Sequence, residues 1–272
     1  DQLDLSKKTY FKNIDVRDNR KLGSYIKKTK PQIVLHLAAQ PIISNSYKDP
    51  RYTYEVNSLG TLNVIDSIKK SNFVKSAIFV TSDKCYENNQ WTWGYRETDK
   101  LGGIDPYSAS KASAEIIFSS YLRSFIFKKN NFGAASVRAG NVIGGGDWSR
   151  DRLVPDIIRS IISSKPIHIR NPKSTRPWQH VLDILNGYIS LAVELNKNKK
   201  INGEAFNFGP KIEKKNDVIN VVKSMRLHWK NAKWRVNKTV GFFESKLLYL
   251  NSSKSRSFLK WKCYLNLKKS IF

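Results

Sequence analysis

The sequence predicts an α/β fold in which a doubly wound parallel sheet carries helices on both faces. Short apolar runs alternate with longer segments whose apolar residues recur at the helical period, and this alternation is typical of such sheets. Hydrophobic residues make up 40% of the 272 residues and aromatic residues 12%, so the chain can bury a substantial core. The same composition argues against a disordered or fibrous chain.

Five segments of the first half carry this alternation. Residues 32–37 form a short apolar run and are predicted to be a buried parallel strand. Residues 57–68 and 109–127 are predicted helices, and residues 76–80 and 133–137 are the next two strands. Parallel sheets place functional side chains at the carboxyl ends of their strands. The segments to inspect are therefore 36–40, 81–84 and 138–146.

The beginning of the chain lacks the glycine-rich turn that cradles a pyrophosphate in dinucleotide-binding folds. No Gly-x-x-Gly-x-x-Gly pattern opens a helix here. The chain starts in the polar residues 4–9 and reaches a short strand-and-turn pattern at 15–18. We therefore expect a fragment that lacks one opening βαβ unit of ~30 or more residues.

After residue 150 the pattern loosens, and we expect a second unit. Residues 1–150 are assigned to the sheet domain, and residues 151–272 to a smaller, mixed domain that closes over the edge of the sheet. The elements predicted in the second unit are helices at 155–163, 183–195 and 217–228 and strands at 167–170 and 206–209.

The chain is strongly basic. Its 48 basic and 22 acidic residues give a formal net charge of +26, which on its own suggests a nucleic-acid partner. The lysines are scattered in ones and twos, however, and aromatic and basic residues cluster only at 230–238 with Trp229 and Trp234. We therefore favour a solvated basic surface with no nucleic-acid partner and keep nucleic-acid binding as an alternative.

The cysteines and the hydropathy indicate the compartment. Cys85 and Cys263 are the two cysteines; they make neither a disulfide framework nor a four-ligand zinc site, and they fit a reducing cytoplasm. No apolar run approaches the roughly 20 residues that cross a bilayer. We expect a cytoplasmic protein with no membrane partner and no metal. His36 has no second ligand at metal-binding spacing and is predicted to be a packed core residue.

Tyr107 and Lys111 stand four residues apart, which places them on one face of a helix. A phenol with its ordinary pKa near ~10 is a poor base at neutral pH, and a neighbouring ammonium lowers that pKa. The pair alone is common in helices. At the end of the preceding strand, however, Ser82, Asp83 and Lys84 offer a hydroxyl, a carboxylate and an amine together. The combination predicts a site of proton transfer.

These residues, with Asn57 and the strand end at 36–39, resemble the extended short-chain dehydrogenases/reductases. Within that group the chain is most similar to the CDP-glucose 4,6-dehydratases. The resemblance is specific in the long segment that contains three glycines and a tryptophan, whereas the tyrosine-lysine pair indicates only the superfamily. It extends from about residue 15 to the 206–210 segment and thins beyond. The segments that carry it are 81–87, 91–97, 136–148 and 176–181.

The resemblance implies a Rossmann-type NAD-binding domain and a C-terminally truncated substrate-binding part. It implies a lyase that converts CDP-glucose to CDP-4-keto-6-deoxyglucose for surface polysaccharide, by oxidation at C4 with bound NAD, loss of water across C5 and C6, and hydride return to C6. It also implies a homo-oligomer, either a dimer or a tetramer. Whether this fragment is active stays open, and a nucleotide-sugar 4-epimerase is the rival within the fold.

The resemblance also implies residue roles. Tyr107 takes the proton of the C4 hydroxyl, Ser82 hydrogen-bonds the reacting oxygen, and Lys111 holds the nicotinamide ribose and keeps Tyr107 acidic. Asp83 is the acid for the C6 hydroxyl. Lys84 is either the base at C5, if it is neutral, or an electrostatic stabiliser of the enolate.

Binding residues follow from the same likeness. Guanidinium groups bind phosphates bidentately, so arginines are expected at the diphosphate of the substrate. The substrate residues implied are Asn141, Arg152 and Arg176. The NAD residues implied are Asp15, Val16, Leu37, Ala38, Ala39 and Asn57, together with Tyr107 and Lys111.

Overall fold

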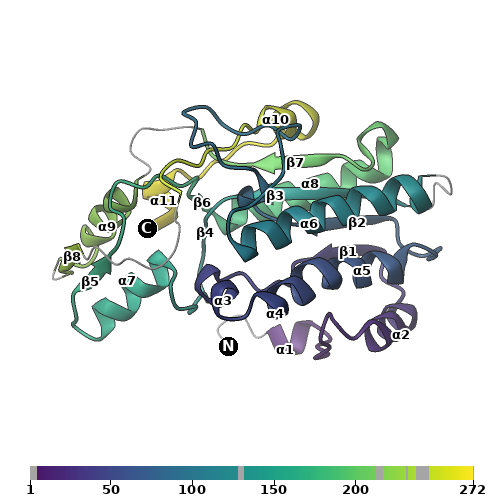
Figure 1. Cartoon of the computed structure of the whole chain (residues 1–272), viewed down its shortest axis with the longest axis horizontal. Helices are drawn as coiled ribbons and strands as arrows, with labels where there is room; N and C mark the ends of the chain where they lie inside the picture. Colours follow the sequence, from purple (N-terminus) through teal and green to yellow (C-terminus); the bar gives the residue numbers. More distant parts are fainter. Residues whose placement is uncertain (1–4, 128–131, 212–216, 231, 237–244, 272) are drawn as a thin grey trace.

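The computed structural model describes residues 5–127, 132–211, 217–230, 232–236 and 245–271. A parallel sheet lies at its centre, with the strand order β1-β2-β3-β7 (Figure 1). The predicted α/β class is therefore confirmed, and each of these strands lies where an apolar run predicted one. The strands span Ile33–His36 (β1), Ser76–Val80 (β2), Gly133–Ala139 (β3) and Ala205–Phe208 (β7).

Strand β1 differs from its prediction because it is not buried. Within the described residues it pairs with β2 alone, and Ile33 and Leu35 are 47% and 39% exposed. Strands β2 and β3, inside the sheet, are buried along nearly their whole length. The apolar run predicts a strand correctly but cannot predict an edge position, since that position depends on which neighbours pair with it.

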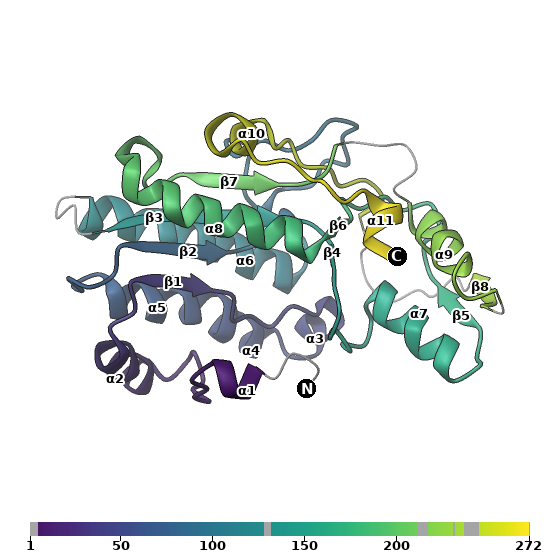
Figure 2. The same ribbon diagram turned by 180° about the vertical axis from the view of Figure 1, so that it is seen from behind.

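The side chains of β2 alternate between two cores, as the two-residue period of a strand requires. Ala77 and Phe79 pack with α2, α5 and α6, whereas Ile78 packs on the opposite face with α8. Figures 1 and 2 show these two helical layers, with α5 and α6 on one face of the sheet and α8 on the other. The helices span Asn19–Thr29 (α2), Gly60–Ile68 (α5), Pro106–Tyr121 (α6), Val181–Lys197 (α8) and Ser253–Leu259 (α10).

The segment before β1 is more helical than the sequence predicts. Of the strand and turn expected at 15–18 only the turn is present, in which the Asp18 N–H donates to the Asp15 carbonyl at 2.9 Å. Asp18 then caps α2, since its carboxylate accepts from the Lys21 N–H at 3.0 Å. Residue 4 lies outside the described residues. The helices before β1 that the sequence did not predict are α1 (Leu5–Lys8) and α2, and α3 (Ile43–Lys48) and α4 (Pro50–Tyr54) after β1 were not predicted either.

Helix α6 begins three residues before the predicted start. Asp105 caps it by accepting from the Ser108 N–H at 2.9 Å, and Pro106 fits the first turn because no donor is needed there. Tyr107 therefore lies inside the first turn of α6. π-Helical turns at Glu55–Leu59 and Leu122–Ile126 precede α5 and follow α6.

A smaller layer lies at the carboxyl end of the sheet (Figures 1 and 2). Its core gathers around Trp178, Val221 and Met225. The boundary expected at residue 150 does not separate the two layers, because β7, α8 and α10 come later in the chain and complete the central sheet region. The smaller layer contains α7 (Leu153–Ile162), α9 (Val218–Arg226), α11 (Leu267–Ile271), β5 (Ile167–Ile169) paired with β8 (Trp234–Val236), and β4 (Val142–Ile143) paired with β6 (Gln179–His180).

Candidate active site

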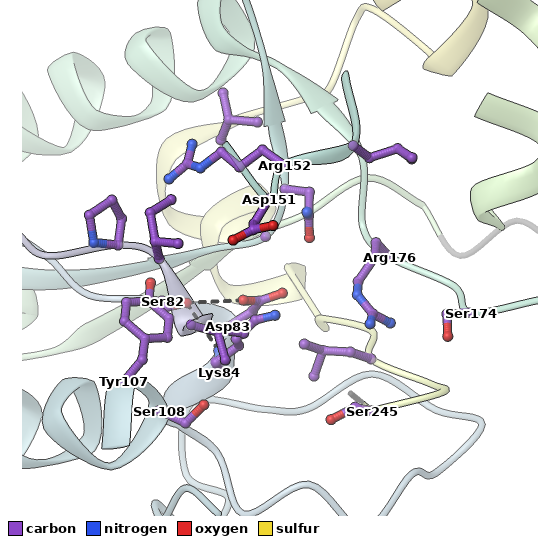
Figure 3. A pocket seen from close by; sticks show the side chains of 18 of the residues that line it. Ser82, Asp83, Lys84, Tyr107, Ser108, Asp151, Arg152, Ser174, Arg176 and Ser245 are labelled. Carbon is purple, nitrogen blue, oxygen red and sulfur yellow. Dashed lines mark hydrogen bonds between the residues drawn. The ribbon is translucent and has the colours of Figure 1, made fainter. Parts of the chain in front are cut away.

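A cavity of about 660 Å³ lies where the carboxyl ends of β2 and β3 meet the smaller layer. Ser82, Asp83, Lys84 and Tyr107 line it from the sheet side, and Arg176 lines it from the smaller layer (Figure 3). Parallel strands end together at one edge of a sheet, which is why functional side chains gather there. The structure thus brings four of the five predicted catalytic residues into one cavity.

The chain leaves β2 in a short 3₁₀ turn that Ser82 caps. The Lys84 N–H donates to Ser82 Oγ at 3.2 Å, and Ser82 Oγ donates to Asp83 Oδ1 at 3.1 Å. Asp83 is buried, and its second oxygen, Oδ2, has no hydrogen-bond partner among the described residues. Burial raises the pKa of Asp83, and the nearby charge of Lys84 only partly offsets this effect. Asp83 is therefore a carboxyl that retains its proton unusually well and has one oxygen available to a ligand.

Tyr107 is 8% exposed, and burial raises the pKa of its phenol to about 12. A hydrogen bond with Ser82 and the charge of Arg152 act in the opposite direction. Lys111 is not among the groups that shift the pKa of Tyr107 here, so its predicted effect on the phenol stays a prediction. The Lys111 ammonium instead donates to the Val80 carbonyl at 3.2 Å, at the end of β2, and burial lowers the pKa of Lys111 to about 8.

Of the residues predicted to hold a cofactor, Tyr107 lines the cavity and the others do not. Of residues 37–39, which follow β1, the first two are exposed and the third is half-buried. Asp15 is ion-paired with Arg17 at 2.8 Å, and Val16 packs under Gly60, where a Cβ would lie 2.8 Å from it. These positions form an open surface beside β1.

Asn57 is buried, and its side chain is engaged within the protein. Its amide donates to the Gln40 carbonyl at 3.1 Å and to Ser110 Oγ at 2.9 Å, and its oxygen accepts from the Gln40 N–H at 2.8 Å. Asn57 therefore holds the turn after β1 against α6. The structure does not bring it to the cavity.

All three residues predicted to bind substrate line the cavity. Arg152 is 39% exposed at its side chain and pairs with Asp147 at 3.0 Å. Arg176 is buried and donates to the Thr175 carbonyl at 2.7 Å. Asn141 lies at the end of β3. Two guanidinium groups that reach one cavity from different elements suit an anionic ligand.

Among the cavity residues that sequence reasoning missed are His168 and Arg170. Ile167 and Ile169 of β5 are buried, so the two-residue period of the strand directs His168 and Arg170 away from that core. The alternation Ile-His-Ile-Arg is visible in the sequence. An interpretation of 167–170 as a strand with one polar side would have found both residues.

His36 is the packed residue that the sequence predicts. Its Nε2 lies 3.1 Å from Thr61 Oγ1, and burial lowers the pKa of the imidazole to about 3, which keeps it neutral. In the part of the chain that the structure describes, no group of three or more His, Cys, Asp or Glu side chains could hold a metal ion. Nor does any described helix have the length and apolarity needed to cross a membrane.

The family profile of GDP-mannose 4,6 dehydratase matches residues 1–271, nearly the whole chain. The chain belongs to the GDP-mannose 4,6 dehydratase family. A CDP-glucose 4,6-dehydratase of Salmonella typhimurium is 44% identical over 252 residues, which cover 91% of this chain and 70% of that protein. A UDP-glucose 4-epimerase of Mycoplasma genitalium is 26% identical and covers 94% of this chain and 78% of that protein.

Solved structures share the fold of this member of the GDP-mannose 4,6 dehydratase family. UDP-glucuronic acid 4-epimerase from Bacillus cereus, in complex with UDP-glucuronic acid and NAD, matches 99% of this chain and 81% of its own at 22% identity and a TM-score of 0.84. dTDP-glucose 4,6-dehydratase from Bacillus anthracis, in complex with NAD, matches 96% and 77% at 21% identity and a TM-score of 0.76. The predicted Rossmann-type fold, the dehydratase resemblance and the prediction of an enzyme are confirmed.

Proposed function

We propose that this chain dehydrates CDP-glucose to CDP-4-keto-6-deoxyglucose. The relative that is 44% identical carries the name CDP-glucose 4,6-dehydratase and supports the choice of substrate. The observation that carries the proposal is Asp83, a buried carboxyl with a raised pKa and an unbonded oxygen, in one cavity with Ser82 and Tyr107. An enzyme that only oxidises and reduces C4 has no use for such an acid, whereas loss of a hydroxyl group requires one.

The proposed cofactor is NAD, which when bound accepts a hydride from C4 of the sugar and returns it to C6. The residues present fit its nicotinamide half. The Lys111 ammonium reaches the end of β2, Tyr107 presents a hydroxyl nearby on the same helix, and the small residues 38 and 39 follow the adjacent strand β1. A cation and a hydroxyl suit the hydroxyl groups of a ribose, and small side chains leave room for a flat ring.

Tyr107 and Ser82 act on the C4 oxygen of the sugar. Ser82 Oγ hydrogen-bonds that oxygen, and Tyr107 takes the proton of the C4 hydroxyl as C4 becomes a carbonyl. Burial raises the pKa of Tyr107 to about 12, so the phenolate needs help. The hydrogen bond with Ser82 and the charge of Arg152 both favour it.

Asp83 and Lys84 act in the elimination. The carbonyl at C4 makes the hydrogen on C5 acidic, and the C5–H bond breaks as a double bond forms to C6. Asp83 donates its proton to the C6 hydroxyl, which leaves as water. Lys84 lines the same cavity and either takes the C5 proton as a neutral amine or, as an ammonium, stabilises the enolate while another group takes that proton. A proton returns to C5 when C6 receives the hydride.

The smaller layer is proposed to bind the nucleotide part of the substrate. Arg152 and Arg176 suit the two phosphates, because a guanidinium group matches phosphate oxygens in pairs. His168 and Arg170 extend the basic lining of the cavity from β5. Asn141, which follows β3 in the chain, also lines the cavity. The substrate-binding part is then the smaller layer. The elements β7, α8 and α10, which also lie within 151–272, belong to the central sheet region instead.

Assembly and compartment are also proposed here. A homo-oligomer, dimer or tetramer, is the expected form, as the family resemblance implies. The two cysteines are free thiols, Cys85 buried and Cys263 half-buried, which supports the cytoplasm as the compartment.

Replacement of Asp83 by Asn tests the dehydration. In single turnovers with NAD and CDP-glucose, Asp83→Asn is expected to oxidise C4 but not to lose water. NADH absorbance and a 4-keto nucleotide sugar that keeps its C6 hydroxyl then accumulate. Asp66→Asn is the matched control, because Asp66 is a carboxylate on α5 that pairs with Lys69 and does not line the cavity. This control is expected to form the 6-deoxy product at the parent rate.

Two results would change the assignment. If Asp83→Asn forms the 6-deoxy product at the parent rate, Asp83 is not the acid. If the parent chain converts CDP-glucose to CDP-galactose, the enzyme is a 4-epimerase and the dehydratase proposal is wrong.

A further inference from the structure

Glu115 and Arg138 form a buried ion pair that the proposed reaction does not use. Their side chains are 3% and 4% exposed, and two parallel contacts join them, Nε to Oε1 at 2.8 Å and Nη2 to Oε2 at 3.0 Å. Glu115 also accepts from the hydroxyls of Thr81 at 2.5 Å and Ser136 at 2.7 Å. Burial costs several kcal/mol per ion in proteins, so a buried pair is weak evidence for stabilisation.

The remaining donors of Arg138 point to a third part of the molecule. Its Nη1 donates to the Tyr86 hydroxyl at 2.8 Å and to the Glu97 carbonyl at 3.0 Å. Tyr86 in turn donates to Asn207 Oδ1 at 2.7 Å. The pair therefore joins α6 to β3 and, through Tyr86, to β7, and its charges are surrounded by fully formed hydrogen bonds.

The pair is coupled to three of the proposed catalytic groups. Thr81, which donates to Glu115, directly precedes Ser82 in the chain. Lys111 lies one helical turn before Glu115 on α6, and Tyr107 lies one turn before Lys111. The Thr81–Glu115 hydrogen bond thus ties the end of β2, which carries Ser82, to the helix that carries Tyr107 and Lys111.

Glu115 is also the charged neighbour of Lys111. Three titratable groups interact with the Lys111 ammonium: Glu115, Cys85 and His36. Burial keeps His36 neutral, with a pKa of about 3, and raises the pKa of the Cys85 thiol far above neutrality. Despite its burial, Glu115 keeps a pKa below its usual value, because Arg138 stabilises the carboxylate. Of these three groups, Glu115 is the one ionised at neutral pH.

We propose that Glu115 and Arg138 are a positioning pair, which ties α6 to the end of β2 and keeps a carboxylate beside Lys111 so that Lys111 stays an ammonium. The role of that ammonium in binding rests on the proposed function. The protonation of Lys111 itself is independent of the proposed function. A buried lysine without an anionic neighbour gives up its proton, and with it one of the three N–H donors with which it can hold a ribose.

The test separates the charge from the fold. Glu115→Gln alone leaves Arg138 as an uncompensated buried cation and is expected to destabilise the protein strongly. The double variant Glu115→Gln/Arg138→Gln removes both charges and keeps hydrogen-bonding side chains. Glu204→Gln is the control, because this substitution removes the same charge at an exposed position, where Glu204 pairs with Lys254 at 2.6 Å.

The readout is the titration of Lys111, followed by NMR in protein labelled at the lysine side chains and assigned with Lys111→Met. In the parent, burial brings the pKa of Lys111 to about 8, so the ammonium is present below that pH and is lost as the pH rises through it. In the double variant the loss is expected at a lower pH, because Glu115 raises the pKa of Lys111 whereas Arg138 is not among the groups that shift it. The alkaline limb of kcat/KM is expected to move with it. Glu204→Gln is expected to leave both unchanged.

An unchanged Lys111 titration in a folded double variant would overturn the inference. If the double variant does not fold, Glu115→Asp replaces it, because the shorter side chain keeps the charge but cannot reach Thr81 equally well. It is expected to keep the parent titration and to lower kcat with little change in KM; a parent-like kcat would contradict the positioning role. The titration needs no substrate, so a failure of the proposed reaction would leave the titration result standing. An unchanged titration would likewise leave the proposed reaction standing.

Discussion

Burial shifts three ionisable side chains, Asp83, Tyr107 and Lys111, toward their neutral forms. The pKa of Asp83 rises, that of Tyr107 rises to about 12, and that of Lys111 falls to about 8. Each shift follows from the loss of water around a charged form. The shift helps Asp83, which must hold a proton to act as an acid. It opposes Tyr107 and Lys111, which the proposed reaction needs in charged form; Ser82 lowers the pKa of Tyr107 and Glu115 raises that of Lys111.

The role of Tyr107 can be tested at this scale. Tyr107→Phe removes one hydroxyl and keeps the ring, so the packing at the first turn of α6 stays. Turnover is expected to fall by on the order of 10²–10⁴, the typical contribution of a general base, while CDP-glucose and NAD bind nearly as before. Binding is measured by calorimetry and turnover by NADH and product analysis. Turnover near the parent value would remove Tyr107 from the proposed role.

At the scale of elements, α8 shows how a segment of the second half completes the sheet. Its buried residues include Ile184, Tyr188, Leu191 and Leu195, which recur every three or four residues and face β2, β3 and β7. This stripe explains why the helix packs on the sheet although it follows residue 150. The packing of α8 covers the face opposite α5 and α6.

Two substitutions of apolar side chains by alanine on α8 test this orientation. Leu191 is fully buried and Val193, two residues later, is 45% exposed. Leu191→Ala is expected to lower the free energy of unfolding by about 2–5 kcal/mol, because it leaves a cavity in the core. Val193→Ala is expected to change it by about 0.5 kcal/mol or less. Denaturant unfolding of both variants measures the difference; equal losses would mean that α8 presents another face to the sheet.

At the scale of the whole molecule, the net charge of +26 needs a physical account. In the described residues, basic side chains at the surface pair with scattered acids, as in Arg17–Glu55, Lys100–Glu87 and Lys254–Glu204. Part of the aromatic and basic stretch at 230–238 lies outside the described residues. Its Trp234 belongs to β8 and packs with the core of the smaller layer. These contacts favour a solvated surface over a nucleic-acid site.

Binding to random duplex DNA distinguishes the two alternatives. A solvated basic surface is expected to bind weakly, with Kd of about 10⁻⁴–10⁻⁶ M near physiological salt, and to release DNA as salt rises. Fluorescence anisotropy across a salt series measures this. Selective binding in the nanomolar range that persists at high salt would support the nucleic-acid alternative instead.

The sequence by itself determined the class of fold and four of the candidate catalytic residues that line the cavity. Apolar runs predict β1, β2, β3 and β7 because residue type favours a strand locally, although the exposure of β1 at the edge of the sheet does not follow from its apolar run. Ser82, Asp83, Lys84 and Tyr107 could be predicted to meet because they follow strand ends or open the next helix. The motifs around them are specific enough to indicate the family.

The tertiary structure decided which segments far apart in the chain pair with and contact one another. The pairing of β7 with β3 joins segments about 70 residues apart, which no local pattern encodes. The ion pair of Glu115 and Arg138 has the same origin. The raised pKa of Tyr107 could not be predicted from its spacing to Lys111, because the sequence shows which charges are near in the chain but not how much water is removed by packing. Electrostatics in a protein depends on that desolvation, and desolvation exists only once the layers have closed.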